Sequence, residues 1–187
     1  IYTWDDKKNK NDIKKFNLFK KSLDQVDYIV ISPGINIQNT KFKLILFRNK
    51  KKIITDLDLF YMQKIPVKSI VITGTNGKST TCTLMHHIFK TNRLDAHLGG
   101  NIGKPILDLK VRKKSIVIIE ASSFQLAYTK FIKPNVAVIL NITNDHLDWH
   151  NTITNYKNSK LKIFSKQDVN DIALLNNKKL IKIFQKK

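Results

Sequence analysis

The sequence predicts an α/β fold with a mainly parallel sheet. Continuous apolar runs, bounded by turn residues, indicate strands that are buried on both faces. Segments with helical spacing lie between these runs, and such alternation is typical of parallel sheets covered by helices. We expect strands within residues 67–74, 114–122, 135–143 and 171–176.

Two blocks of different regularity suggest two domains. We expect the first over residues 1–66 and the second over residues 67–187, with Pro66 as the natural boundary. In the first block, Val26–Ser32 predicts a buried strand, which Pro33 would stop.

Four further segments carry helix signals. Residues 41–54 are ambiguous, because their apolar content favours a strand while their length permits a helix. A helix is expected to start near Thr55. In the second block, helices are expected over Lys78–Lys90 and within residues 154–166.

Composition and charge narrow the class of protein. The chain has 187 residues, an apolar fraction of 42% and a formal net charge of +20. The lysines are scattered and do not interleave with aromatic residues, so a solvated surface is favoured over specific nucleic-acid binding. The apolar runs are too short to span a bilayer. The single cysteine, Cys82, fits a reducing compartment, and we expect a cytoplasmic protein.

The stretch "GTNGKST" predicts a nucleotide-binding loop, because it joins a strand to a helix. It lacks the first glycine of the Walker pattern, since Ile72 stands there, and a glycine-containing turn capped by hydroxyls is the alternative. Lys78 would neutralise phosphates, and the hydroxyl of Ser79 or Thr80 would reach Mg²⁺. The residues expected to contact ATP are Gly74, Thr75, Asn76, Gly77, Lys78, Ser79 and Thr80.

Polar residues follow two other predicted strands. Glu120 ends one strand, and residues 141–146 follow the next. Ligands bind at the carboxyl edge of such sheets, so these residues would face the phosphate loop, where a carboxylate can hold Mg²⁺. On pattern alone, a capping or core role for His146 is an equal alternative.

Several motifs resemble the Mur ligase family. "GTNGKST" is similar to the ATP loop of Mur ligases and folylpolyglutamate synthases. Residues 118–164, with "E-x-SSFQL", "NIT-x-DHLD-x-H" and "Y-x-x-SK-x-x-IF", resemble the D-glutamate-adding Mur ligases, as does "GGNIGKPIL" at residues 99–107. The resemblance implies part of a Rossmann-like domain followed by an incomplete P-loop-type ATPase domain.

The implied activity is ATP-dependent ligation in peptidoglycan precursor synthesis. The resemblance implies that D-glutamate is joined to UDP-N-acetylmuramoyl-L-alanine through an acyl phosphate. It implies catalytic roles for Lys78, Glu120, His146 and Lys160. Two Mg²⁺ ions would be held by Ser79, Glu120, His146 and a carbamylated Lys160.

For Lys160, residue type and family resemblance lead to different expectations. By itself, a lysine in a lysine-rich helix is read as a solvated surface residue. Carbamylation by CO₂ requires a neutral amine, so the resemblance implies that burial depresses the pKa of Lys160.

The substrate contacts are also implied by the resemblance. Asn101, Ser122 and Gln125 would contact the UDP-sugar, and Asp5 and Ser32 would contact its uridine diphosphate. Ser122 also fits a helix-capping role, and Ser32 also fits a plain turn.

The resemblance covers nearly the whole chain. It begins inside the first domain and stops inside the ATPase domain, so we expect a piece of a longer, monomeric enzyme that is inactive by itself. The alternatives are another Mur-type or folylpolyglutamate synthase-like ligase, or a basic nucleic-acid-binding module.

Overall fold

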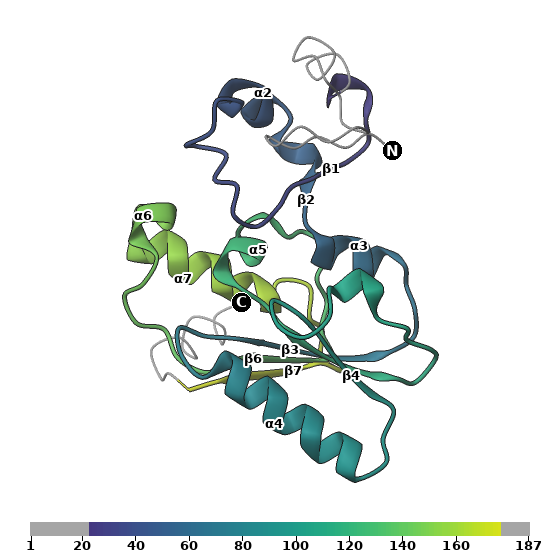
Figure 1. Cartoon of the computed structure of the whole chain (residues 1–187). Helices are drawn as coiled ribbons and strands as arrows, with labels where there is room; N and C mark the ends of the chain where they lie inside the picture. Colours follow the sequence, from purple (N-terminus) through teal and green to yellow (C-terminus); the bar gives the residue numbers. More distant parts are fainter. Residues whose placement is uncertain (1–22, 177–187) are drawn as a thin grey trace. The chain divides into compact units, whose positions relative to one another are not determined.

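The computed structural model describes residues 23–176 of the chain (Figure 1). Contacts divide the chain into two compact units, Ile1–Ile54 and Thr55–Lys187. No helix within the described residues is both long enough and apolar enough to cross a bilayer.

The first unit contains a small parallel sheet. Strand β1 (Ile29–Val30) pairs in parallel with β2 (Ile53–Ile54). The prediction of a strand over Val26–Ser32 was therefore too long. Only two residues pair because β2 is equally short, and the Ser32 carbonyl already accepts a turn hydrogen bond from the Ile35 N–H at 3.0 Å.

The ambiguous segment of the first unit is helical. Helix α2 spans Lys43–Arg48, and the 3₁₀ helix η1 (Lys50–Lys52) leads into β2. Leu46 is buried while Leu44 is 79% exposed. The apolar run that favoured a strand therefore leaves one of its leucines in water.

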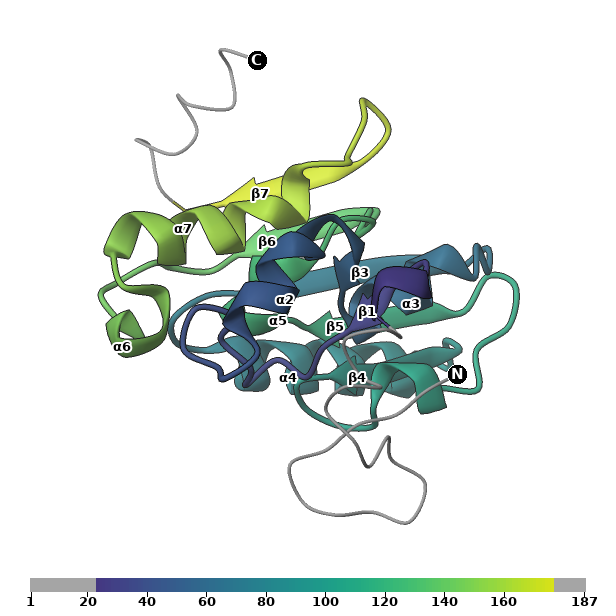
Figure 2. The ribbon, with the colours of Figure 1, turned by 90° about the horizontal axis from the view of Figure 1, so that it is seen from above.

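The second unit is built on one five-stranded parallel sheet with the order β4-β5-β3-β6-β7, which Figure 2 shows from above. Four of its strands lie within the predicted apolar runs. The strands are β3 (Lys68–Thr73), β4 (Ala96–Gly100), β5 (Ile116–Glu120), β6 (Val136–Ile139) and β7 (Ile172–Leu175).

Strand β4 has no counterpart among the predictions. Its sequence, AHLGG, contains two glycines and a histidine and lacks a continuous apolar run. It forms because β5 provides a complete parallel partner, with the register running from Ala96 opposite Ile116 to Gly100 opposite Glu120.

Helices cover both faces of this sheet (Figure 1). The predicted helix starts hold, since Thr55 caps the first helix and Lys78 begins the second. The helices are α3 (Asp56–Met62), α4 (Lys78–Thr91), α5 (Ser123–Tyr128), α6 (Leu147–His150) and α7 (Ile153–Leu161), with 3₁₀ helices η2 (Ile106–Asp108) and η3 (Lys162–Phe164).

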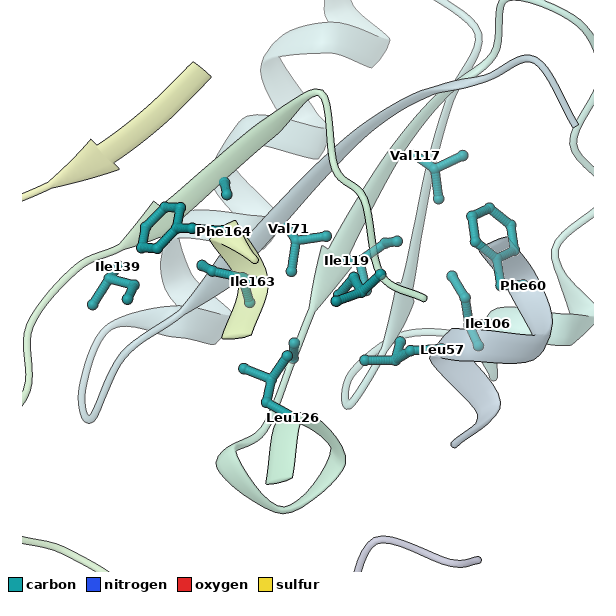
Figure 3. Packing of buried hydrophobic residues seen from close by; sticks show 13 residues of the cluster. Leu57, Phe60, Val71, Ile106, Val117, Ile119, Leu126, Ile139, Ile163 and Phe164 are labelled. Carbon is teal, nitrogen blue, oxygen red and sulfur yellow. The ribbon is translucent and has the colours of Figure 1, made fainter. Parts of the chain in front are cut away.

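The strand residues alternate between two apolar cores. Val71 and Ile119 point into the larger core, which α3, α5 and η3 complete (Figure 3). Ile72 and Ile118 point to the opposite face, where Cys82 of α4 packs on them. Burial on both faces explains why these strands are continuously apolar.

A buried carboxylate joins α3 to the rest of the second unit. Asp58 Oδ1 accepts hydrogen bonds from the Thr129 hydroxyl at 2.7 Å and from the N–H groups of Lys130 and Phe131 at 2.8 and 2.7 Å. Its Oδ2 accepts from the N–H and hydroxyl of Thr55 at 2.9 and 3.3 Å. Helix α3 therefore belongs structurally to the second unit. The functional domain boundary expected at Pro66 stays a prediction.

Candidate active site

The phosphate loop lies where it was predicted, between β3 and α4. Ile72 is buried in β3, which continues to Thr73, so the loop begins only at Gly74. Gly77 precedes α4 with φ of +82°, a conformation that favours glycine. Ser79 and Thr80 are exposed in the first turn of the helix. The position at which the Walker pattern has its first glycine is thus a buried strand residue here.

Lys78 folds back onto its own loop. Its Nζ donates to the carbonyl oxygen of Thr75 at 2.9 Å. The loop is also bonded to α7, because the Thr75 hydroxyl lies 3.0 Å from the Tyr156 hydroxyl. The loop residues and α7 therefore form one site, although about eighty residues of sequence separate them.

Lys160 of α7 is buried beside the phosphate loop. Its side chain is 1% exposed, and its Nζ donates to the Gly74 carbonyl at 2.8 Å and to the Thr73 hydroxyl at 3.3 Å. Burial, and next the nearby charge of Lys78, lower the pKa of Lys160 to about 7. The surface interpretation of this lysine is therefore wrong, and the depressed pKa implied by the resemblance is confirmed.

Glu120 ends β5 with one oxygen satisfied and one without a partner. Its Oε1 accepts a hydrogen bond from the Asn101 amide at 2.8 Å. Its Oε2 is buried and has no hydrogen-bond partner among residues 23–176. A buried carboxylate oxygen without a donor is costly, and a hard cation is the kind of ligand that would satisfy it. Glu120 therefore fits the predicted metal role.

His146 occupies an exposed and unusual position. Its side chain is 46% exposed, and its Nε2 lies 3.4 Å from Asp145 Oδ2. The residue has φ of +51° and stands at the N-cap of α6, where its side chain makes no capping bond. The alternative of a core histidine is therefore wrong. An imidazole exposed at this edge remains able to bind a ligand.

His150 was not predicted as a site residue. It is 3% exposed, its Nε2 lies 3.0 Å from the Ser123 hydroxyl, and its ring stacks on Phe124. Burial first, then the charges of His146 and Lys160, lower the pKa of His150 to about 4. The imidazole is therefore neutral near pH 7. The second histidine of "DHLDWH" was the available signal.

The residues expected to contact the UDP-sugar, Asn101, Ser122 and Gln125, form hydrogen bonds within the protein. Asn101 contacts Glu120, as described above. Ser122 caps α5, and its N–H and hydroxyl donate to Gln125 Oε1, both at 3.1 Å. The Gln125 amide donates to both oxygens of Asp56, at 3.2 and 3.1 Å. The capping alternative for Ser122 is thus confirmed, while the substrate roles stay predictions.

Two predicted residues cannot be placed at this edge. Asp5 lies outside the described residues. Ser32 lies in the first unit, where its carbonyl closes a turn.

The described residues do not include a preformed group of metal-ligating side chains. Among residues 23–176, no three His, Cys, Asp or Glu side chains gather as a metal site. The predicted set contains only two such residues, Glu120 and His146, and its other members are a serine hydroxyl and a modified lysine. The oxygen donors present, Glu120 Oε2 and the Ser79 hydroxyl, are of the kind that a hard cation such as Mg²⁺ prefers.

A parallel sheet with a strand–loop–helix phosphate cradle at its carboxyl edge defines an α/β protein of the phosphate-loop class. The family model described as the Mur ligase middle domain matches residues 72–187. The chain therefore belongs to the Mur ligase family.

Two curated relatives with the same name are similar over most of this chain. The UDP-N-acetylmuramoylalanine–D-glutamate ligase of Rickettsia prowazekii is 43% identical over 151 residues, covering 81% of this chain and 34% of the relative. The ligase of the same name from Clostridioides difficile is 39% identical over 176 residues, covering 92% of this chain and 39% of the relative. The chain thus spans about a third of the length of these relatives.

Solved structures support the fold. The UDP-N-acetylmuramate:L-alanyl-γ-D-glutamyl-meso-diaminopimelate ligase from Neisseria meningitides matches with a TM-score of 0.57 at 15% identity, covering 90% of this chain and 58% of that one. The MurF ligase from Thermotoga maritima, in complex with ADP, matches with a TM-score of 0.53 at 18% identity, covering 84% of this chain and 48% of that one.

Proposed function

We propose that the protein carrying this chain is an ATP-dependent ligase that joins D-glutamate to UDP-N-acetylmuramoyl-L-alanine. The observation that carries the proposal is the pair of buried groups beside the phosphate loop. Glu120 keeps one oxygen without a donor, and Lys160 is held with its Nζ 2.8 Å from the Gly74 carbonyl. The identity to the D-glutamate ligases supports the choice of substrates.

The residues of the loop would bind the triphosphate. The N–H groups at the start of α4 and the helix dipole favour phosphate oxygens. Lys78, whose Nζ rests on the Thr75 carbonyl, would turn to the β- and γ-phosphates. The carboxylate of the L-alanyl group would attack the γ-phosphorus, ADP would leave, and the amine of D-glutamate would displace phosphate from the acyl phosphate.

Four residues from different elements of the second unit would hold two Mg²⁺ ions. Ser79, Glu120 and His146 are the proposed ligands, together with Lys160 as its carbamate. When bound, such ions neutralise charge that develops on the transferred phosphoryl group. The fit rests on the unpaired Oε2 of Glu120 and on the exposure of the His146 imidazole.

The environment of Lys160 supports the proposal that this lysine is carbamylated. Because burial lowers its pKa to about 7, a large fraction of the amine is neutral near neutral pH and able to attack CO₂. The amine nitrogen bonds to the carbon of CO₂ and releases a proton, which gives an anionic carbamate. Such an anion supplies the oxygen donors that Mg²⁺ prefers and that an ammonium group cannot offer.

The remaining assignments complete the proposal. Asn101, Ser122 and Gln125 would contact the UDP-sugar, with Asp5 and Ser32 toward its uridine diphosphate. Residues 1–66 would contribute to the UDP-binding domain and residues 67–187 to the ATP-binding domain. We propose a monomeric, cytoplasmic enzyme.

ADP release tests the proposal. The protein carrying this chain is mixed with ATP, Mg²⁺, UDP-N-acetylmuramoyl-L-alanine and either D-glutamate or another amino acid. We expect ADP formation that depends on D-glutamate, its loss in Lys160→Ala, and partial recovery with added formate or acetate. Lys157→Ala, on the partly exposed side of the same helix, is the matched control.

Two results would contradict the proposal. ADP formation with folates and L-glutamate, but not with the UDP-sugar, would move the assignment to the folylpolyglutamate synthase-like ligases. Full activity of Lys160→Ala would remove Lys160 from the site.

A further inference from the structure

The loop after β6 holds the phosphate loop, and Asn141 makes most of the bonds. Its Oδ1 accepts from the N–H groups of Thr75 and Asn76 at 3.1 and 2.9 Å. Its Nδ2 donates to the Asn76 carbonyl at 3.0 Å, and its own carbonyl accepts from the Thr75 N–H at 3.0 Å. One residue therefore binds two successive loop residues through both donors and acceptors.

The same two loops are packed closely against each other. A Cβ at Gly74 would lie 3.2 Å from Leu140 Cβ and 3.4 Å from the backbone of Asn141. The Thr75 hydroxyl adds contacts on the other side, since it accepts from the Thr143 N–H at 3.0 Å and donates to the Thr143 carbonyl at 3.3 Å. The position of the phosphate loop is thus set by the end of β6.

We propose that Asn141 is a positioning residue that orders the phosphate loop before nucleotide binds. This inference rests on the proposed function, because it assumes that the loop binds ATP. Fixing the backbone of a loop residue costs conformational entropy. A loop that is already held in place avoids that loss on binding. The side chain of Asn141 provides the bonds that hold Thr75 and Asn76.

The amide group is chemically specific to this task. An aspartate at position 141 would still accept from the two N–H groups, but it would lose the bond to the Asn76 carbonyl. It would also place a negative charge beside the triphosphate. Alanine would lose all three side-chain bonds. The two replacements therefore separate loop order from phosphate affinity.

The test combines nucleotide affinity with hydrogen exchange in the whole protein carrying this chain. Isothermal titration with ATP and Mg²⁺ compares wild type with Asn141→Ala, Asn141→Asp and Asn144→Ala. Asn144 is an exposed residue of the same loop, so its replacement is the matched control. Exchange of the peptide spanning residues 71–82 reports the order of the phosphate loop without nucleotide.

We expect Asn141→Ala to weaken ATP binding about tenfold, because it removes three hydrogen bonds of modest strength from the loop. Its loop peptide exchanges faster than in wild type, while the rest of the sheet is unchanged. Asn141→Asp keeps slower exchange than Asn141→Ala but still binds ATP weakly. Asn144→Ala behaves like wild type.

Contrary outcomes separate this inference from the proposed function. If wild type binds ATP and Asn141→Ala binds it equally well with equal exchange, the positioning role is wrong. The role is also wrong if Asn141→Ala speeds exchange throughout the sheet, since that marks a general loss of stability. If wild type binds no ATP, the proposed function fails, and the inference fails with it.

Discussion

Asp58 and Glu120 are both buried carboxylates of the second unit, yet their surroundings differ. Asp58 is 0% exposed, and both of its oxygens accept hydrogen bonds from Thr55 and the segment 129–131. Glu120 is 1% exposed, and its Oε2 has no donor within the part of the chain that the structure describes. A fully paired buried carboxylate rigidifies its surroundings, whereas a buried oxygen without a donor is costly unless a ligand or water satisfies it.

The surroundings of the two carboxylates differ in the same way. Around Asp58, polar groups are matched within the protein and rigidify a connection. At the phosphate loop, Lys78 and Lys160 donate to backbone carbonyls rather than to carboxylates, and Glu120 keeps one oxygen without a partner among the described residues. Substrate phosphates and cations would complete the second group.

The largest effect is expected on stability at Asp58. Asp58→Ala leaves the donors of Thr129, Lys130 and Phe131 without their acceptor. We expect the free energy of unfolding to fall by about 3–5 kcal/mol, because several buried donors become unpaired. Thermal or urea unfolding measures the change. An exposed control, Asp108→Ala, should change little, and an equal loss in both variants would contradict the assigned role.

Glu120 should show the opposite behaviour. Glu120→Gln removes the charge that would hold a cation, so we expect turnover to fall by about 10²–10³-fold. The free energy of unfolding should change by less than about 1 kcal/mol, since the charge was only half paired. Steady-state ADP release and thermal unfolding are measured on the same preparation. Strong destabilisation with retained turnover would invert the comparison.

The lowered pKa of Lys160 should make the free energy of unfolding depend on pH. Its folded pKa of about 7 lies below the ordinary lysine value of 10.5, so the unfolded state binds more protons between these values. Stability therefore rises with pH through this window, with a slope of at most about 1.4 kcal/mol per pH unit. Lys160→Met should remove this contribution, whereas Lys157→Met should keep it. Urea unfolding in CO₂-free buffer from pH 7 to 9 checks this. Equal slopes in wild type and Lys160→Met would contradict the burial argument.

The smallest effect is expected at Ser122, which joins the two regions through Gln125 and Asp56. Ser122→Ala removes the N-cap of α5 and should lower the free energy of unfolding by about 1 kcal/mol. Affinity for UDP-N-acetylmuramoyl-L-alanine, measured by titration calorimetry, shows whether the serine also contacts substrate. Unchanged affinity would leave Ser122 with a capping role alone.

The regions also differ in how well the sequence predicted them. The strands β3, β5 and β6 were predictable because burial on both faces makes them continuously apolar. Strand β4 was missed because its pairing with β5, rather than its own propensity, makes it a strand. The strand near Ile29 was predicted too long, since the length of its partner β2 is not visible locally.

In the candidate site, too, the features set by local sequence were predictable and those set by distant contacts were not. The loop at residues 74–80 was recognisable because glycines, a lysine and hydroxyls occur together in sequence. The burial of Lys160 comes from packing against Thr73 and Gly74, which are distant in the chain, so residue type alone pointed to the surface. The bonds of Asn141 to the phosphate loop are equally non-local.

Counting bound Mn²⁺ tests whether the unpartnered Oε2 of Glu120 belongs to a cation site. The protein carrying this chain is titrated with Mn²⁺ in the presence of a non-hydrolysable ATP analogue and UDP-N-acetylmuramoyl-L-alanine, and free Mn²⁺ is read by electron paramagnetic resonance. We expect two bound ions in wild type and at least one fewer in Glu120→Gln. The same number of bound ions in both proteins would contradict the account.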